Sequence, residues 1–510
     1  MSLANLSHEP LAESPADTRA AKSRAIVIGA GFGGLAAAIR LGARGYQVTV
    51  VDKLDKPGGR AYVYEDEGFV FDAGPTIVTA PFLIEELWTL CGKKMSDDVE
   101  LVPMNPYYRI RFDDGSHFDY SGNDEAMKAE VARFNPADVE GYDRFMAASA
   151  KLYEIGMDKL LAVSFDSLKT VVKVIPDLLK GQFYRSVHSL VARYFEDPKL
   201  RQVFSFHPLL IGGNPFTATA IYALIGQLER THGVHFAMGG TGAIVRGMVG
   251  LIEGQDGELR LGQQVKEITV DAGRATGVEL VGGERLAADV VVSNADAAAT
   301  YRHLVPGHKR KRWTDRKLHR TRYSMSLFVW YFGTNRRYDE VPHHMIMLGS
   351  RYKELLKDIF DHKTLAEDFS LYLHRPTATD PSLAPEGCDS FYVLSPVPNL
   401  DGDTNWETEA ERYRAAIAQA LEETVLPGLE ASVVTSRQLT PVDFRERLFS
   451  FKGAAFSLEP VLWQSAWFRP HNRSEELEGL YLVGAGTHPG AGMPGVISSA
   501  KVLDEVVPDP

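Results

Sequence analysis

A glycine-rich turn between a short apolar run and an alanine-rich segment constrains this chain most. Residues 24–29 form a β-branched run that is typical of a buried parallel strand. Gly29, Gly31 and Gly34 follow in the spacing Gly-x-Gly-x-x-Gly, and residues 35–41 then predict a helix. In such a unit the first glycine permits a tight turn, the second lets the backbone approach a pyrophosphate, and the third lets the helix pack closely on the strand. The sequence therefore predicts a Rossmann-type unit that binds a dinucleotide.

An acidic residue after the next strand narrows the choice of dinucleotide. Residues 47–51 predict that strand, which ends at Asp52. A carboxylate there accepts hydrogen bonds from a ribose diol and repels a 2′-phosphate. The complete pattern occurs once, because the glycines at 239–242 have no clear strand before them and no acid at the right distance after them. We therefore predict a single tightly held FAD and no second, nicotinamide-binding domain.

Two further glycine turns suit the same ligand. Arg60 follows two glycines just after the second strand, where its guanidinium can give charge-assisted hydrogen bonds to a pyrophosphate or a flavin ring. Residues 484–495 are dense in glycine, which costs backbone entropy and suggests backbone pressed against a large flat ligand. A helix from about Val496 could stabilise negative charge on a reduced ring. The candidate cofactor-binding residues are Gly29, Gly31, Gly33, Gly34, Asp52, Lys53, Gly59, Arg60, Gly74, Thr76, Val265, Gly486, Met493, Pro494 and Gly495.

Composition argues against several other classes of protein. The net charge is −12, with Lys and Arg spread along the chain, so we expect no nucleic-acid partner. Cys91 and Cys388 lie far apart, so we predict no disulfide framework, no redox cysteine pair and no metal site. The first residues lack the apolar core of a secretory signal, and no apolar run reaches the roughly 18 residues that span a bilayer. We expect a cytoplasmic protein that is soluble or attached to one membrane face.

The order of predicted elements indicates a mixed α/β fold built from interleaved segments. Alternation around Asp113, Asp114 and Gly115 predicts a hairpin over residues 107–120. The expected divisions are a disordered tail (1–23), a discontinuous FAD-binding domain (24–105, 239–300 and 441–505), a discontinuous substrate domain (106–150 and 301–440) and a helical, membrane-associating insertion (151–238).

Residues 167–195 combine basic and apolar side chains within an acidic chain. A basic amphipathic segment is typical of membrane-surface binding. The alternative is a helix packed on the body of the protein with a solvated basic face. The segment has one acidic residue, Asp177, and five basic residues, so its net charge is +4 (five minus one). The basic residues are Lys169, Lys173, Lys180, Arg185 and Arg193.

Longer motifs add a resemblance to a known family. From Arg24 to about Val502 the chain resembles the bacterial and fungal type of phytoene desaturase, within the flavin amine oxidase-like superfamily. The family often has Glu where this chain has Asp52, and the shorter acid still suits a ribose diol. The central and C-terminal motifs are the more specific. The motifs that carry the resemblance are 29–34, 56–61, 71–76, 204–215, 366–372, 464–473 and 484–492.

The resemblance implies an FAD-dependent carotenoid desaturase that converts phytoene to neurosporene or lycopene by successive dehydrogenations. Allylic hydride passes to the flavin, and a proton leaves the adjacent carbon. The implied partners are phytoene and partly desaturated carotenoids, a membrane surface, and a quinone or oxygen as electron acceptor. At about 0.8 kcal/mol per buried carbon unit, a forty-carbon hydrocarbon would lose on the order of 30 kcal/mol by entering water. We therefore expect a peripheral protein on the cytoplasmic face that draws its substrate from the membrane through an apolar tunnel.

The proton acceptor and two alternative functions stay open at this point. An allylic cation is acidic enough for water to suffice, and His488 and His207 are only weak candidates for the base. One alternative is a desaturase of a later carotenoid intermediate or another flavin oxidase. The other is a flavin-free isoprenoid-binding carrier, against which the intact glycine set argues.

Overall fold

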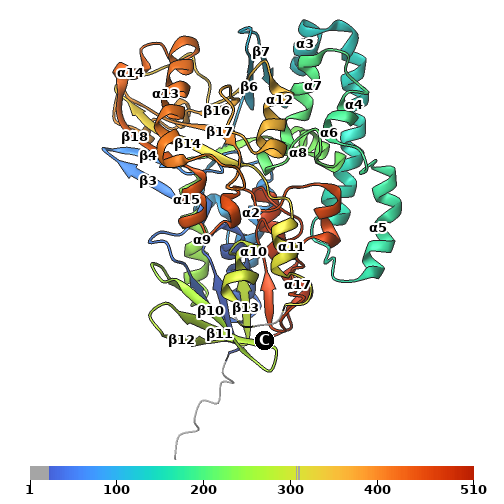
Figure 1. Cartoon of the computed structure of the whole chain (residues 1–510), viewed down its shortest axis with the longest axis vertical. Helices are drawn as coiled ribbons and strands as arrows, with labels where there is room; N and C mark the ends of the chain where they lie inside the picture. Colours follow the sequence, from blue (N-terminus) through green and yellow to red (C-terminus); the bar gives the residue numbers. More distant parts are fainter. Residues whose placement is uncertain (1–21, 306, 308–309) are drawn as a thin grey trace, which may run out of the picture.

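The chain folds around two main sheets at opposite ends of the molecule (Figure 1). The computed structural model describes residues 22–305, 307 and 310–510. Of the tail predicted over residues 1–23, residues 1–21 therefore lie outside the described residues. Figure 1 shows the smaller sheet near the C-terminus, the larger sheet at the far end, and a group of helices beside the larger sheet.

The smaller sheet has five parallel strands in the order β19-β13-β1-β2-β9, so segments far apart in the sequence meet in it. Its strands are β1 (Arg24–Ile28), β2 (Gln47–Val51), β9 (Glu258–Arg260), β13 (Val290–Ser293) and β19 (Leu480–Leu482). Alanine, leucine and isoleucine side chains of the first helix fill the space against this sheet. The helices packed there are α1 (Phe32–Ala43), α2 (Pro81–Leu90), α9 (Thr241–Glu253), α16 (Met493–Lys501) and α17 (Leu503–Val506). The predicted Rossmann-type unit is confirmed.

A small antiparallel sheet covers the other face of these parallel strands. It consists of β10 (Val265–Asp271), β11 (Arg274–Leu280) and β12 (Arg285–Ala287). Ile26 and Val51 of the parallel sheet pack against Ile268 and Val278. Burial on both faces explains why the central strands β1 and β13 consist almost entirely of apolar residues.

The larger sheet has seven strands in the order β18-β14-β17-β16-β15-β6-β7, and only the β15–β6 pair is parallel. Successive side chains of β14 point to opposite faces. Phe328 and Trp330 face the long helix α13 (Trp406–Thr424), whereas Leu327 and Tyr331 face the interior. The strands are β6 (Tyr108–Phe112), β7 (His117–Tyr120), β14 (Ser326–Thr334), β15 (His344–Leu348), β16 (Leu371–His374), β17 (Asp389–Val397) and β18 (Val433–Leu439), and the first two form the predicted hairpin.

The helical group begins before the boundary predicted at residue 151. Helix α4 (Val139–Tyr153) continues without interruption into a π-helical stretch, Glu154–Leu160. The boundary predicted at 151 therefore falls inside one continuous helix. The predicted division into domains stays a prediction. The helices of this group are α3 (Asp124–Phe134), α4 (Val139–Tyr153), α5 (Leu168–Lys180), α6 (Val187–Val191), α7 (Pro198–Ser205) and α8 (Leu224–His232).

Short elements connect these layers. They are β3 (Val63–Asp66), β4 (Phe69–Asp72), β5 (Leu101–Pro103), β8 (His235–Ala237), α10 (Ala297–Ala299), α11 (Asp315–Arg320), α12 (Tyr352–Lys357), α14 (Leu429–Ser432) and α15 (Pro441–Glu446). Within the described ranges, no helix is both long and apolar enough to cross a bilayer.

Candidate functional site

One cavity of about 610 Å³ joins the glycine fingerprint to helix α5. At one end its wall is largely backbone, contributed by the segments around 29–33, 58–62 and 484–496. Elsewhere its wall is apolar and aromatic side chains. These include Phe165, Val171, Val174, Leu178, Phe183, Phe206, Tyr222, Met325, Leu327, Tyr331, Leu394 and Phe468.

The fingerprint glycines divide into packing positions and cavity positions. A Cβ on Gly34 would lie 1.9 Å from the carbonyl oxygen of Gly29, so Gly34 sets the close approach of α1 to β1. Gly31 has an extended backbone and lines the cavity, where a Cβ would meet only the Asn294 amide nitrogen, at 3.1 Å, and the Gly58 oxygen, at 3.7 Å. The N-terminus of α1 therefore meets the cavity through bare backbone, which suits a phosphate ligand.

Asp52 lies at the cavity wall, directly after β2. Its Oδ2 accepts a hydrogen bond of 2.6 Å from the backbone N–H of Ala30, and its Oδ1 accepts one of 2.8 Å from that of Leu54. Burial raises the pKa of this carboxyl, and the two backbone donors oppose that rise. The carboxylate is thus held at the site where the ribose acid of a Rossmann-type unit is expected.

Arg60 reaches the same cavity from the turn after Gly59. Its Nε donates to the carbonyl oxygen of Ala455 at 2.7 Å, and its Nη2 donates to the Ser450 hydroxyl at 2.9 Å. Burial lowers the pKa of the guanidinium, and the negative charge of Asp296 opposes this. These contacts hold a cation at the wall where a pyrophosphate or flavin ring would need one.

Most of the other predicted residues also line the cavity. Gly34 and Gly486 do not, because both are used in packing: a Cβ on Gly486 would lie 2.7 Å from the Cβ of Ala297. Their part in cofactor binding stays a prediction. The predicted residues that line the cavity are Gly29, Gly31, Gly33, Asp52, Lys53, Gly59, Arg60, Gly74, Thr76, Val265, Met493, Pro494 and Gly495.

Asn294 is a cavity residue that the sequence reasoning missed. Its Nδ2 donates to the carbonyl oxygen of Gly29 at 3.3 Å, and its amide lies against Gly33 and Gly484, so it fastens two glycine turns together. Asn294 follows β13, and ligands of such sheets bind beyond the carboxyl ends of the strands. The apolar run 290–293 followed by a polar residue was the available signal.

The two histidines considered as bases occupy different positions. His488 lines the cavity, its Nε2 lies 2.8 Å from the carbonyl oxygen of Leu160, and burial lowers its pKa to about 4. His207 is buried behind the wall, where its Nε2 lies 3.2 Å from Oε2 of Glu229. Glu229 itself lines the cavity, and the sequence reasoning did not single it out.

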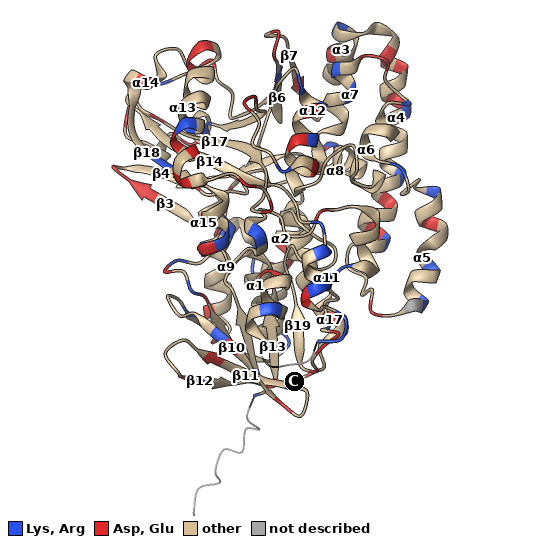
Figure 2. Cartoon of the chain, in the orientation of Figure 1, with Lys and Arg blue, Asp and Glu red and all other residues tan. Residues whose placement is uncertain are grey.

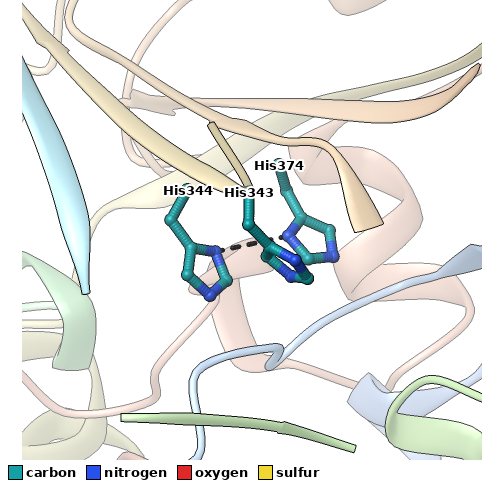
Figure 3. A group of neighbouring side chains, drawn as sticks. All are labelled: His343, His344 and His374. Atoms are coloured by element: carbon teal, nitrogen blue, oxygen red, sulfur yellow. Dashed lines mark hydrogen bonds between the residues drawn. The ribbon is translucent and has the colours of Figure 1, made fainter. Parts of the chain in front are cut away.

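Three further histidines meet beside the cavity (Figure 3). The register of β15 and β16 pairs His344 with His374, whose Nδ1 atoms are 3.3 Å apart, and His343 precedes His344. Tyr372, which lines the cavity, places its hydroxyl 2.7 Å from Nδ1 of His344. Each Nε2 is buried without a hydrogen-bond partner among the described residues. A trio of this kind could ligate a metal ion, and the sequence expectation of no metal site stays a prediction.

Helix α5 has two apolar faces. Val171, Val174 and Leu178 line the cavity. On the outer side Val172, Ile175 and Leu179 are 66%, 44% and 64% exposed. Figure 2 shows basic residues spaced along the same helix, which stands at the edge of the molecule. The exposed apolar side chains thus lie on the same helix as three exposed lysines, Lys169, Lys173 and Lys180.

Comparison with known proteins agrees with this geometry. The family model described as flavin containing amine oxidoreductase matches residues 32–502. The neurosporene-forming phytoene desaturase of Rhodobacter capsulatus is 51% identical over 492 residues, which cover 95% of this chain and 94% of the relative. The lycopene-forming phytoene desaturase of Pantoea ananas is 51% identical over 476 residues, which cover 93% and 97%.

More distant relatives extend the comparison. An all-trans-zeta-carotene desaturase of Myxococcus xanthus is 34% identical over 485 residues, which cover 94% of this chain and 92% of the relative. The solved structure of cyclohexylamine oxidase from Brevibacterium oxydans matches with a TM-score of 0.59 at 16% identity, and the match covers 95% of this chain and 99% of that one. At that identity the structural likeness concerns the fold alone.

Proposed function

The chain belongs to the flavin containing amine oxidoreductase family, and we propose that within this family it is an FAD-dependent phytoene desaturase. The predicted family and FAD as cofactor are confirmed. The two phytoene desaturases are 51% identical to this chain, against 34% for the zeta-carotene desaturase, and this difference favours phytoene over a later intermediate. Relatives of equal identity form neurosporene and lycopene, so either product suits the chain.

The observation that carries this proposal is the single cavity with two unlike ends. Bare glycine backbone, Asp52 and Arg60 meet at one end, and apolar side chains continue from there to α5. Bound FAD supplies the acceptor for a hydride from an allylic carbon. The chain contributes the rest: the glycine turns hold the pyrophosphate, Asp52 binds the ribose, and the apolar wall excludes water and aligns a linear hydrocarbon.

We also propose that α5 attaches the protein to the cytoplasmic face of a membrane. The exposed apolar side chains of α5 suit the acyl boundary, and its lysines suit anionic headgroups. Leu462 and Phe468, which also line the cavity, are 38% and 54% exposed. A hydrocarbon entering between such surfaces would pass from lipid to the cavity without crossing water.

The electron acceptor is proposed to be a quinone or oxygen that visits the reduced flavin. The sequence carries one complete dinucleotide fingerprint, at Gly29, Gly31 and Gly34. A nicotinamide cofactor would need a second one for stable binding.

Pigment formation in cells that accumulate phytoene tests the proposed function. Expression of this chain should convert colourless phytoene to neurosporene or lycopene, identified by absorbance and mass. Unchanged phytoene in cells that contain soluble, FAD-loaded protein would contradict the proposal, and conversion of supplied zeta-carotene alone would favour the later desaturase.

A further inference from the structure

Beyond the cofactor end, the cavity wall holds a single carboxylate. Among the described residues that line it, the acidic ones are Asp52 and Glu229. Asp52 belongs to the dinucleotide turn. Glu229 lies in α8 among Ile225, Leu228 and other apolar lining residues, with 0% of its surface exposed. Burying a carboxylate among apolar side chains costs free energy unless the carboxylate is hydrogen-bonded, so the hydrogen-bond partners of Glu229 matter.

The structure holds both carboxylate oxygens of Glu229. The Tyr108 hydroxyl donates to Oε1, and Nε2 of His207 lies 3.2 Å from Oε2. Burial and the charge of Glu229 raise the pKa of Tyr108 well above its usual value, so this hydroxyl keeps its proton and remains a donor. Tyr107 adds a hydrogen bond of 3.2 Å to the main-chain oxygen of Glu229. The carboxylate therefore has one orientation at the cavity wall.

Polar side chains connect this carboxylate to the cofactor end. The Tyr108 ring lies 6.4 Å from that of His344, whose Nδ1 is 2.7 Å from the Tyr372 hydroxyl. That hydroxyl is 3.1 Å from Oγ1 of Thr76, one of the proposed FAD-binding residues. Contacts through Tyr108, His344 and Tyr372 thus link Glu229 to Thr76.

We propose that Glu229 is the catalytic base that takes the proton in each dehydrogenation, an assignment that rests on the proposed function. When hydride has left one allylic carbon for the flavin, that carbon is cationic. The C–H bond on the adjacent carbon then breaks, its electron pair forms the new double bond, and the proton goes to a carboxylate oxygen of Glu229. The negative charge also stabilises the cation while it forms, because opposite charges interact strongly in an apolar cavity.

The other candidates in the cavity suit this role less well. His488 uses Nε2 in a contact with the Leu160 carbonyl oxygen and carries no charge to stabilise a cation. His207 does not reach the cavity and acts on Glu229 instead, as a positioning residue. Asp52 accepts hydrogen bonds from the backbone N–H groups of Ala30 and Leu54 and belongs to the dinucleotide turn.

The test compares Glu229→Gln with the parent in an anaerobic single turnover on phytoene in liposomes. Glutamine keeps the shape and an oxygen for Tyr108 but loses the charge and the basicity. General base catalysis contributes about 10²- to 10⁴-fold, so product formation should fall at least 100-fold while FAD uptake and the melting temperature stay unchanged. Glu253→Gln, an exposed position outside the cavity, is the matched control and should behave as the parent.

A second variant keeps the proposal testable if Glu229→Gln does not fold. Tyr108→Phe removes one donor to the carboxylate and so loosens its orientation at the cavity wall. The single-turnover rate at saturating phytoene should then fall, while FAD uptake and the phytoene concentration that gives half the maximal rate stay unchanged. Product formation at the parental rate in Glu229→Gln, or in folded, FAD-loaded Tyr108→Phe, would overturn the assignment. A parent enzyme that does not oxidise phytoene at all would refute the proposed function itself.

Discussion

The cofactor end and the lipid-facing end of the cavity are built in opposite ways. The cofactor end is bare backbone at Gly29, Gly31 and Gly33, with Asp52 and Arg60 close by in the sequence and the glycine turn 484–496 from the other end of the chain. The lipid-facing end is made of side chains, and it draws on segments as far apart as 165–183, 325–331 and 462–468.

This difference determines which amino-acid substitutions each end of the cavity tolerates. Where backbone forms the wall, one added side chain occupies the space of the ligand or collides with its neighbours. Where apolar side chains form the wall, changes that conserve volume cost little, because hydrophobic packing is not tied to particular atoms. We therefore expect single substitutions to abolish function at the cofactor end, and groups of substitutions to weaken it at the other.

The largest expected effect is at Gly31. Gly31→Val should abolish FAD uptake, because the side chain would project into the place of the pyrophosphate, and the extended backbone there accepts valine without strain. Flavin absorbance and the FAD-dependent rise in melting temperature are the measurements. Gly34→Val, whose Cβ would collide with the Gly29 oxygen, should instead fail to fold. Normal flavin content in Gly31→Val would contradict the claim that bare backbone at Gly31 makes room for the pyrophosphate.

A smaller effect is expected from the outer apolar face of α5. Replacing Val172, Ile175 and Leu179 together by Ser should reduce liposome binding by roughly 100-fold, because each buried apolar side chain contributes about 1.5–3 kcal/mol and these three enter the bilayer only in part. FAD content and melting temperature should not change, since these side chains are exposed. Co-sedimentation with liposomes measures the effect, and undiminished binding would show that α5 is not the attachment surface.

The lysines of α5 should contribute less than its apolar side chains. Changing Lys169, Lys173 and Lys180 to Glu moves the local charge by six units, and each basic residue near an anionic surface contributes about 1 kcal/mol. Binding to anionic liposomes should fall at least tenfold, and added salt should no longer weaken it. Binding to neutral liposomes is the control and should be unaffected. If the triple variant sediments with anionic vesicles as well as the parent does, the charge of this helix has no part in attachment.

A last expected effect, on stability rather than on binding, concerns the buried histidines and pH. Burial lowers the pKa of His343 to about 3 from the ordinary value of 6.5, and lowers the pKa values of His344 and His374 well below 6.5. The unfolded chain therefore binds more protons below pH 6.5 than the folded chain does. Stability should fall as pH drops from 6.5 towards 3, by up to about 1.4 kcal/mol per pH unit for each histidine that stays neutral.

Melting temperature measured against pH, for the parent and for His343→Asn, is the check on this prediction. The variant should lose less stability between pH 6.5 and pH 5 than the parent. Equal slopes would show that His343 does not stay neutral in the folded chain.

The sequence predicts the cofactor end well because its geometry is a local consequence of glycine. Gly31, Asp52 and Arg60 each stand in a short motif, and the structure brings all three to one cavity. Gly486 stands in an equally dense motif but is used for packing against Ala297, a distinction that depends on the partner segment.

The residues that sequence reasoning missed depend on pairings across the fold. Glu229 lies in an ordinary amphipathic helix, and its role becomes visible only when the hairpin residue Tyr108 meets it. His343, His344 and His374 come together through the register of β15 and β16, which the chain does not reveal locally. The boundary expected at 151 falls inside one continuous helix, because α4 passes directly into the stretch Glu154–Leu160, and the predicted division into domains stays a prediction.

The central claim is that a lipid-dissolved hydrocarbon reaches a flavin through this one cavity. Its most direct test is to mix purified, FAD-loaded protein with phytoene-containing liposomes, with oxygen, quinone and nicotinamides excluded, and to follow the visible spectrum. The account predicts that the oxidised flavin bands bleach while absorbance of a longer polyene appears, in equal amounts, and that added quinone restores the flavin. Flavin that stays oxidised in the presence of phytoene would contradict it.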